Sequence, residues 1–413
     1  MSPQPPIKQK SNGLRGRPDF LLLVLTLLLV GFGLVMVFSA SSNTAVISKS
    51  SNFDALYFTK RQLMWAVMGI VSMFVVMNIP YTVFKKGFIL YFIPVLIMLI
   101  LVPFIGKELN GARSWFGIGP LGIQPTEFAK LGLILYLGSL ISKKGEKFRE
   151  FKKGLVPVFV IIGIICGLIM MQPDLGGCIV IAAYSLIIIV AGGANLKQLV
   201  LAGVIVSTLV AAWASISMMS SPKNWEYRVH RFTAFMDPTS DEQNTTYQLS
   251  RSLQALGHGS ITGAGFGHSV QKLHYLPYAY SDFIFSVIAE EFGFLGSLMF
   301  LLFYLFFLWR GLLVALRCPD TYGTIVGVGI VGMFAVQALV NIGGVTGAMP
   351  LTGVTLPFIS HGGSSLIVCL LGMGVLLSIS REYNRPDKPQ QQPSRTTTNN
   401  HTQTLRPQQA ARK

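Results

Sequence analysis

Residues 20–40 read FLLLVLTLLLVGFGLVMVFSA, an apolar stretch of 21 residues without a charged side chain. An α-helix rises about 1.5 Å per residue, so this stretch is long enough to cross the roughly 30 Å hydrocarbon core of a bilayer. It is too long for the apolar region of a cleavable signal peptide. The stretch therefore predicts a membrane anchor that stays in the protein.

The composition extends this prediction to the whole chain. Of its 413 residues, 51% are hydrophobic and only 12% are charged, about half the charged share of a soluble domain. We therefore predict an all-α polytopic membrane protein. The net charge of +16 does not indicate nucleic-acid binding, because membrane proteins concentrate Lys and Arg in their cytoplasmic loops.

Further apolar stretches bring the number of predicted transmembrane helices to ten. An even number places both termini on the same side of the membrane. Of the 33 Lys and Arg residues, 22 lie in the termini and loops of one side, which is therefore predicted to be cytoplasmic. The predicted spans are residues 20–41, 62–79, 87–105, 126–142, 154–171, 174–193, 196–218, 282–309, 322–345 and 361–380.

These spans divide the chain into a cytoplasmic N-terminal tail (1–19), a ten-helix membrane domain (20–382) and a C-terminal tail (383–413). The C-terminal tail is rich in Gln, Pro, Thr, Asn and Arg, and we expect it to be disordered. The largest extracellular loop, 219–281, lies between spans seven and eight, and a loop of this length is usually functional. Within it, residues 245–256 have a helical pattern.

Charged side chains near the predicted outer face are candidates for function, because charge is costly in a membrane. Glu127 and Lys130 are three residues apart on one helix face, where they form either a structural salt bridge or a substrate contact. Asp174 follows a proline at a sharp turn and is a candidate helix cap as well as a site residue. Asp282 opens span eight and is either a cap or a general base.

Other polar groups lie deeper in the spans or in the large loop. Glu290 and Glu291 are expected to pair with each other inside the bundle, and Gln337 and Asn341 are further deep polar residues. Arg228, Arg231 and Lys272 suit an anionic headgroup, with a solvated loop face as the alternative. Ser364 belongs to the Gly-Gly-Ser-Ser start of span ten, where free backbone N–H groups would face an anion.

Motifs spread along residues 20–382 resemble the SEDS family (shape, elongation, division and sporulation), and most of all its cell-division branch. They are GLVMVFSAS (33–41), GARSW (111–115), QPTEFAKL (124–131), QPDLG (172–176), YRVHR (227–231), QKLHYLP (271–277), SDFIF (281–285), EE (290–291) and LTGVTLPFISHGGSS (351–365). The chain departs from the family pattern at Tyr278 and Tyr280, where Glu and His are common, and at His361, where Tyr is usual.

The resemblance implies a peptidoglycan glycosyltransferase that polymerises lipid II at the outer face of the bacterial cytoplasmic membrane. In the family the aspartate of the Asp-Phe-Ile-Phe motif, here Asp282, is the essential acid. The polar cleft near it would be lined here by Arg113, Glu127, Lys130 and Asp174. The division branch works at the septum with a class B penicillin-binding transpeptidase and other divisome membrane proteins.

Several alternatives stay open at this point. A lipid II flippase would need a polar path through the bilayer, and a structural scaffold would use Asp282 only as a helix cap. An elongation or sporulation paralogue would share the chemistry. No cofactor is certain; a divalent metal, Mg or Mn, carried by the lipid pyrophosphate is a hypothesis.

Overall fold

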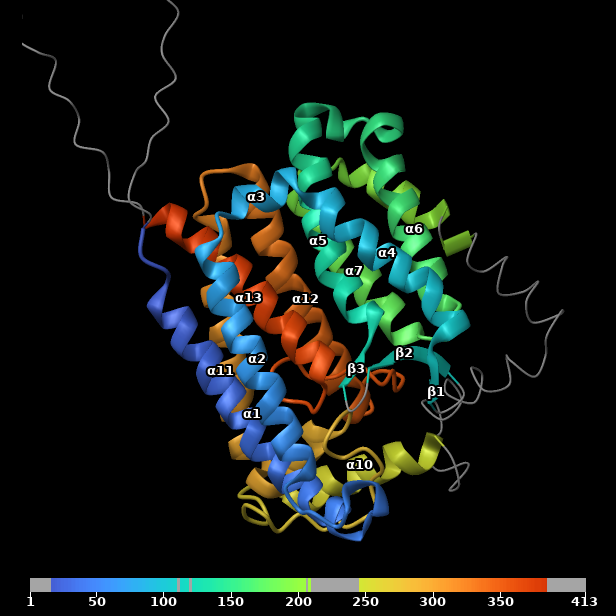
Figure 1. Cartoon of the computed structure of the whole chain (residues 1–413), viewed down its shortest axis with the longest axis vertical. Coiled ribbons are helices and arrows are strands. Elements are labelled where there is room, and N and C mark those ends of the chain that lie inside the picture. The colour runs from blue at the N-terminus through green and yellow to red at the C-terminus, as the bar shows by residue number, and fades with distance from the viewer. Residues whose placement is uncertain (1–15, 110–111, 119–120, 206, 209–244, 385–413) are drawn as a thin grey trace, which may run out of the picture.

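The structure is a computed structural model that describes residues 16–109, 112–118, 121–205, 207–208 and 245–384. The chain is mostly helical, and its helices pack side by side as a bundle (Figure 1). The helices are α1 (Phe20–Ile47), α2 (Tyr57–Asn78), α3 (Tyr81–Lys86), α4 (Phe88–Ile105), α5 (Pro125–Lys144), α6 (Val156–Met170), α7 (Leu175–Ala191), α10 (Thr245–Gly259), α11 (Ile284–Leu316), α12 (Thr321–Val345) and α13 (Gly363–Tyr383).

The predicted membrane protein is confirmed, since seven helices of the described chain are long and apolar enough to cross a membrane. Nine of the predicted spans coincide with α1, α2, α4, α5, α6, α7, α11, α12 and α13. A further helix, Leu196–Ile205, covers the start of the seventh predicted span, and most of the rest of that span lies outside the described residues. Helix α10 confirms the helical pattern predicted over residues 245–256.

The two ends of the described chain lie side by side at one end of the bundle. The Arg381 Nε donates a hydrogen bond to the Gly16 carbonyl at 3.0 Å, and the Asp19 N–H donates to the Ser380 hydroxyl at 2.9 Å. Helix α3 lies at this end, whereas α10 and the strands lie at the opposite end (Figure 1).

Helices α12 and α13 are buried over most of their length and form the centre of the bundle. Glycines allow their close packing. A Cβ on Gly327 of α12 would lie 2.6 Å from the Ala315 Cβ of α11, and a Cβ on Gly363 would overlap the Trp65 ring of α2. The core of the protein is therefore built by the C-terminal helices, with α1, α2, α4 and α6 outside them.

A small antiparallel sheet follows α4 and corrects the all-α prediction. It consists of β1 (Lys107–Leu109), β2 (Ala112–Ile118) and β3 (Leu121–Ile123), in the order β1-β2-β3. The sequence contains a hairpin signal at this position, Asn110 followed by Gly111, which a search for long apolar spans does not detect. The sheet places β2 beside the start of α5.

Helix α11 is interrupted at Gly293, where φ is 66° and ψ is −167°, although the sequence predicts one continuous span. The loop after α10 replaces the lost helical hydrogen bonds. Ala264 and Gly265 donate to the carbonyls of Glu290 and Glu291, while Phe294 and Leu295 donate to the carbonyls of residues 260 and 261. Because these backbone groups remain paired, the break is stable inside the protein.

Candidate active site

Asp282 lies just before α11, at the end of the bundle that holds α10 and the sheet. Its side chain is partly exposed, and the Ser281 hydroxyl donates to its Oδ1 at 2.9 Å. The N-cap of α11 is Phe283, and this cap position makes no side-chain hydrogen bond within the described part of the chain. Asp282 therefore lies one position before the N-cap of α11.

Glu127 and Lys130 form the predicted pair on α5. The Lys130 Nζ lies 2.8 Å from the Glu127 Oε1, and both side chains are buried. The Glu127 Oε2 is also buried and has no hydrogen-bond partner among the described residues. The pair neutralises itself and still offers one carboxylate oxygen to a donor.

Asp174 caps α7, as predicted, because its Oδ1 accepts the Gly177 N–H at 2.7 Å. The turn that carries Asp174 is tied to two other elements. The Ser114 hydroxyl of β2 donates to the Gln172 carbonyl at 3.2 Å, and the Thr126 hydroxyl of α5 donates to the Gln172 Oε1 at 3.3 Å. The neighbours of these residues in sequence, Arg113, Glu127 and Asp174, are thereby brought to one region, with the Arg113 side chain exposed.

The segment 351–365 joins this region to Asp282. A Cβ on Gly176, at the start of α7, would lie 2.6 Å from the Thr352 carbonyl oxygen, and a Cβ on Gly353 would lie 3.5 Å from the Asp282 Oδ2. At the other end of the segment, the Ser364 hydroxyl accepts the Gln124 N–H at 3.0 Å beside the start of α5. Asp282, the start of α7 and the start of α5 therefore border the same segment.

Ser364 has a different role from the predicted anion contact. Its hydroxyl is buried, donates to the Gly122 carbonyl at 3.1 Å and accepts the Gln124 N–H. Both hydrogen bonds tie the start of α13 to the segment between the sheet and α5. Sequence reasoning missed this role because the partners are about 240 residues away.

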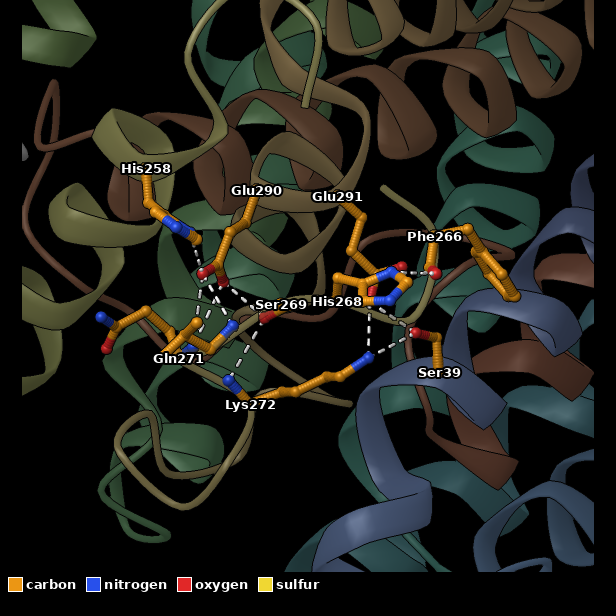
Figure 2. A network of polar contacts seen from close by, with 10 residues as sticks. Ser39, His258, Phe266, His268, Ser269, Gln271, Lys272, Glu290 and Glu291 are labelled. Carbon is orange, nitrogen blue, oxygen red and sulfur yellow. Dashed lines mark hydrogen bonds and ion pairs between the residues drawn. The ribbon is translucent and has the colours of Figure 1, made fainter. Parts of the chain in front are cut away.

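Lys272 also departs from its predicted role as a substrate-binding cation. Its side chain is 6% exposed, and its Nζ lies 2.7 Å from the Glu291 Oε1 and 2.9 Å from the Ser39 hydroxyl of α1 (Figure 2). Lys272 therefore ties the large loop to α1 and α11 through its buried ammonium.

Glu290 and Glu291 do not pair with each other, which corrects the sequence prediction. The Glu290 carboxylate accepts hydrogen bonds from the Val270 N–H at 2.9 Å, the His258 Nδ1 at 2.9 Å and the Ser269 hydroxyl (Figure 2). Successive residues of a helix point about 100° apart, so adjacent carboxylates contact different partners. Each glutamate therefore holds a different part of the loop that leads to Asp282.

An aromatic cluster beside Asp282 was not predicted. The ring centroids of Phe58 and Tyr280 are 4.5 Å apart, and those of Tyr280 and His361 are 5.6 Å apart. His361 precedes α13 and lies outside the spanning helices. Burial, with a smaller contribution from the Arg61 charge, lowers the pKa of His361 from 6.5 to about 4. His361 is therefore neutral at pH 7.

Some of the predicted residues are not described by the structure. Arg228 and Arg231 lie outside the described residues, as do residues 1–15 and 385–413 of the predicted tails. Within the described residues, no group of three or more His, Cys, Asp or Glu side chains is arranged to hold a metal ion.

Comparisons with known proteins indicate the same family that the sequence motifs resemble. A family model described as "Cell cycle protein", covering the FtsW, RodA and SpoVE proteins, matches residues 19–385. The chain is 41% identical over 371 residues to stage V sporulation protein E of Bacillus subtilis, covering 89% of this chain and 98% of that protein. It is 40% identical over 372 residues to the "Probable peptidoglycan glycosyltransferase FtsW" of the same organism, covering 88% and 90%.

Solved structures resemble the whole bundle. A chain of a peptidoglycan synthase complex, described as coordinating polymerization and crosslinking, aligns with a TM-score of 0.67 and 28% identity, covering 89% of this chain and 98% of that one. The rod shape determining protein RodA of Thermus thermophilus aligns with a TM-score of 0.61 and 27% identity, covering 90% and 98%.

Proposed function

Because the chain belongs to the family of cell cycle proteins that contains FtsW, RodA and SpoVE, we propose that it is a peptidoglycan glycosyltransferase that polymerises lipid II into glycan strands at the outer face of the bacterial cytoplasmic membrane. The observation that carries the proposal is the partly exposed carboxylate of Asp282, which borders the same segment as a buried Glu127–Lys130 pair. In this proposal both termini and the tails 1–19 and 383–413 are cytoplasmic, and ten spans form residues 20–382.

Asp282 acts in the proposed reaction as the general base. A sugar hydroxyl of the acceptor lipid II attacks C1 of the growing strand, and its proton passes to the Asp282 carboxylate. The bond between C1 and the pyrophosphate oxygen breaks, and undecaprenyl pyrophosphate leaves with the electron pair. The transfer inverts the configuration at C1, so no covalent enzyme intermediate is required.

Cations near the cleft support the departure of the pyrophosphate. Arg113 is exposed on β2, and Lys130 lies at the start of α5 beside Glu127. A guanidinium suits phosphate oxygens because it presents several donors in one plane. Arg228 and Arg231 of the large loop belong to the proposed substrate-binding set on their sequence alone, and Glu127 and Asp174 complete it as acceptors for sugar hydroxyl groups.

A divalent metal, Mg or Mn, fits the site only as an ion bound to the pyrophosphate of the substrate. The described residues contain no three-ligand cluster, whereas Mg²⁺ is commonly held by one or two carboxylates together with phosphate oxygens. Such a metal would be held mainly by the pyrophosphate oxygens of the lipid and would neutralise their charge.

The proposed setting is the division septum, where the chain would act with a class B penicillin-binding transpeptidase and other divisome membrane proteins. The likeness to a chain of a peptidoglycan synthase complex supports a transpeptidase partner. Three of the four deep polar residues argue against a flippase, because Glu290, Glu291 and Asn341 are engaged in hydrogen bonds that hold loops together.

The test is polymerisation of fluorescent lipid II by the purified protein, with and without its partner transpeptidase. We expect glycan strands from the wild type and at least 100-fold less product from Asp282→Asn. Asp54→Asn is the matched control, because Asp54 is an exposed carboxylate paired with Lys60. Strands from Asp282→Asn at the wild-type rate would remove Asp282 from the mechanism, and no strands from any protein would favour a flippase, which lipid-flip measurements detect.

The similarity to a sporulation protein supports a second candidate role for this chain, peptidoglycan synthesis during sporulation. The chain is 41% identical to the sporulation protein and 40% identical to FtsW of Bacillus subtilis, so identity does not separate the two roles. Complementation in that organism distinguishes them: restored septation after FtsW depletion supports division, and restored spores without restored septation support sporulation.

A further inference from the structure

The backbone carbonyl groups of residues 280, 281 and 282 each accept a hydrogen bond from the C-terminal part of the chain. The Tyr280 carbonyl accepts the His361 N–H at 2.9 Å. The Ser281 carbonyl accepts the Ser360 hydroxyl at 2.6 Å, and the Asp282 carbonyl accepts the Asn341 side-chain amide at 2.8 Å. The backbone that carries the proposed base is therefore held by residues 59 to 81 positions later in the sequence.

Asn341 connects this backbone to a second segment. Its Nδ2 also donates to the Val354 carbonyl at 2.7 Å, and the side chain is buried in α12. One amide nitrogen thereby uses both of its N–H groups on carbonyls of different segments. Gly353, the neighbour of Val354, packs against the Asp282 carboxylate, so Asn341 fixes both sides of this contact.

Ser360 makes a similar connection. Its hydroxyl donates to the Ser281 carbonyl and accepts the Leu356 N–H at 2.9 Å. This single buried hydroxyl closes the turn of residues 356–360 and docks it on the residue before Asp282. Position 282 also precedes the first helical residue of α11, so the helix itself does not fix its backbone.

We propose that Asn341 and Ser360 are positioning residues that set the direction of the Asp282 carboxylate toward the acceptor sugar. The inference rests on the proposed function, in which Asp282 is the base. A general base has to lie within hydrogen-bond reach of the proton that it removes, and a displacement of about 1 Å lowers the rate by about 100-fold. Neither residue has to touch the substrate for this effect.

The experiment measures kcat and KM for lipid II polymerisation, normalised to folded protein, in Asn341→Leu, Ser360→Ala and Ser360→Thr. We expect Asn341→Leu to lower kcat by about 100-fold with KM for lipid II within threefold of the wild type. Ser360→Ala should lower kcat by about tenfold, and Ser360→Thr, which keeps the hydroxyl, should restore most of it.

Gln337→Leu is the matched control. Gln337 is the same type of side chain, lies one turn earlier on α12 and is equally buried. It should retain kcat within threefold of the wild type. If Asn341→Leu does not fold, the Ser360 pair alone decides the question.

Two results would overturn the inference. One is folded Asn341→Leu, or Ser360→Ala, with kcat within threefold of the wild type. The other is an equal loss in Gln337→Leu, which would show a general effect of removing a polar group from α12. Failure of the proposed function looks different, because the wild type would then make no strands or Asp282→Asn would make them normally.

Discussion

The buried contact between Lys272, Glu291 and Ser39 leads to a stability prediction that the structure defines closely. Lys272→Met removes the ammonium and keeps most of the apolar volume. The Glu291 carboxylate is fully buried, and its second oxygen, Oε2, has no hydrogen-bond partner among the described residues. The substitution therefore leaves a buried charge whose only ion-pair partner in the described chain is gone.

The expected cost follows from this burial. Removing one partner of a buried ion pair costs about 3–5 kcal/mol, because the remaining charge loses its compensation and stays away from water. The Lys272–Ser39 hydrogen bond contributes about 1 kcal/mol of this. In the double variant Lys272→Met/Glu291→Leu no unpaired charge remains, so we expect the free energy of unfolding to return to within about 1 kcal/mol of the wild type.

The assay is equilibrium unfolding in detergent micelles, followed by tryptophan fluorescence. Lys60→Met is the matched control, because the Lys60–Asp54 distance is also 2.7 Å but the two side chains are 64% and 38% exposed. The control should cost less than about 1 kcal/mol. The reasoning would be refuted if Lys272→Met cost no more than Lys60→Met, or if the double variant were as unstable as the single one.

Two further predictions concern His361 and Gly293. The folded protein lowers the pKa of His361 from 6.5 to about 4, so the neutral imidazole contributes fully to the free energy of unfolding above pH 6.5 and loses this contribution as the pH falls toward 4. The loss in the free energy of unfolding reaches about 3 kcal/mol. A pH titration of stability should show this loss in the wild type but not in His361→Phe. Gly293→Ala should cost about 1–3 kcal/mol, because φ is 66° and the new Cβ would overlap the Gly263 backbone, whereas Gly167→Ala in α6 meets nothing within 4 Å and should be neutral in the same unfolding assay.

Local patterns in the sequence predicted much of the architecture and part of the site. Apolar stretches of the right length predicted the helices, because a bilayer admits only segments whose backbone groups are satisfied internally. The spacing of Glu127 and Lys130 predicted their pair, and the proline before Asp174 predicted its cap, since both depend only on helix geometry. The motif around Asp282 identified the candidate base from resemblance.

Tertiary structure decided what the polar groups contact. From the sequence, Lys272 was predicted to bind an anionic headgroup. In the structure its ammonium pairs with Glu291 where the large loop packs on α1 and α11. Asn341 and Ser360 carried no local signal for their contacts with the backbone at Asp282, because those contacts form only when α12 and the segment before α13 pack against the start of α11. The sequence by itself determined where the long apolar helices form, because a span depends on the length and polarity of one segment. The contacts that hold the backbone at Asp282 follow only from packing between segments that lie 59 to 81 residues apart in the chain, which no local pattern specifies.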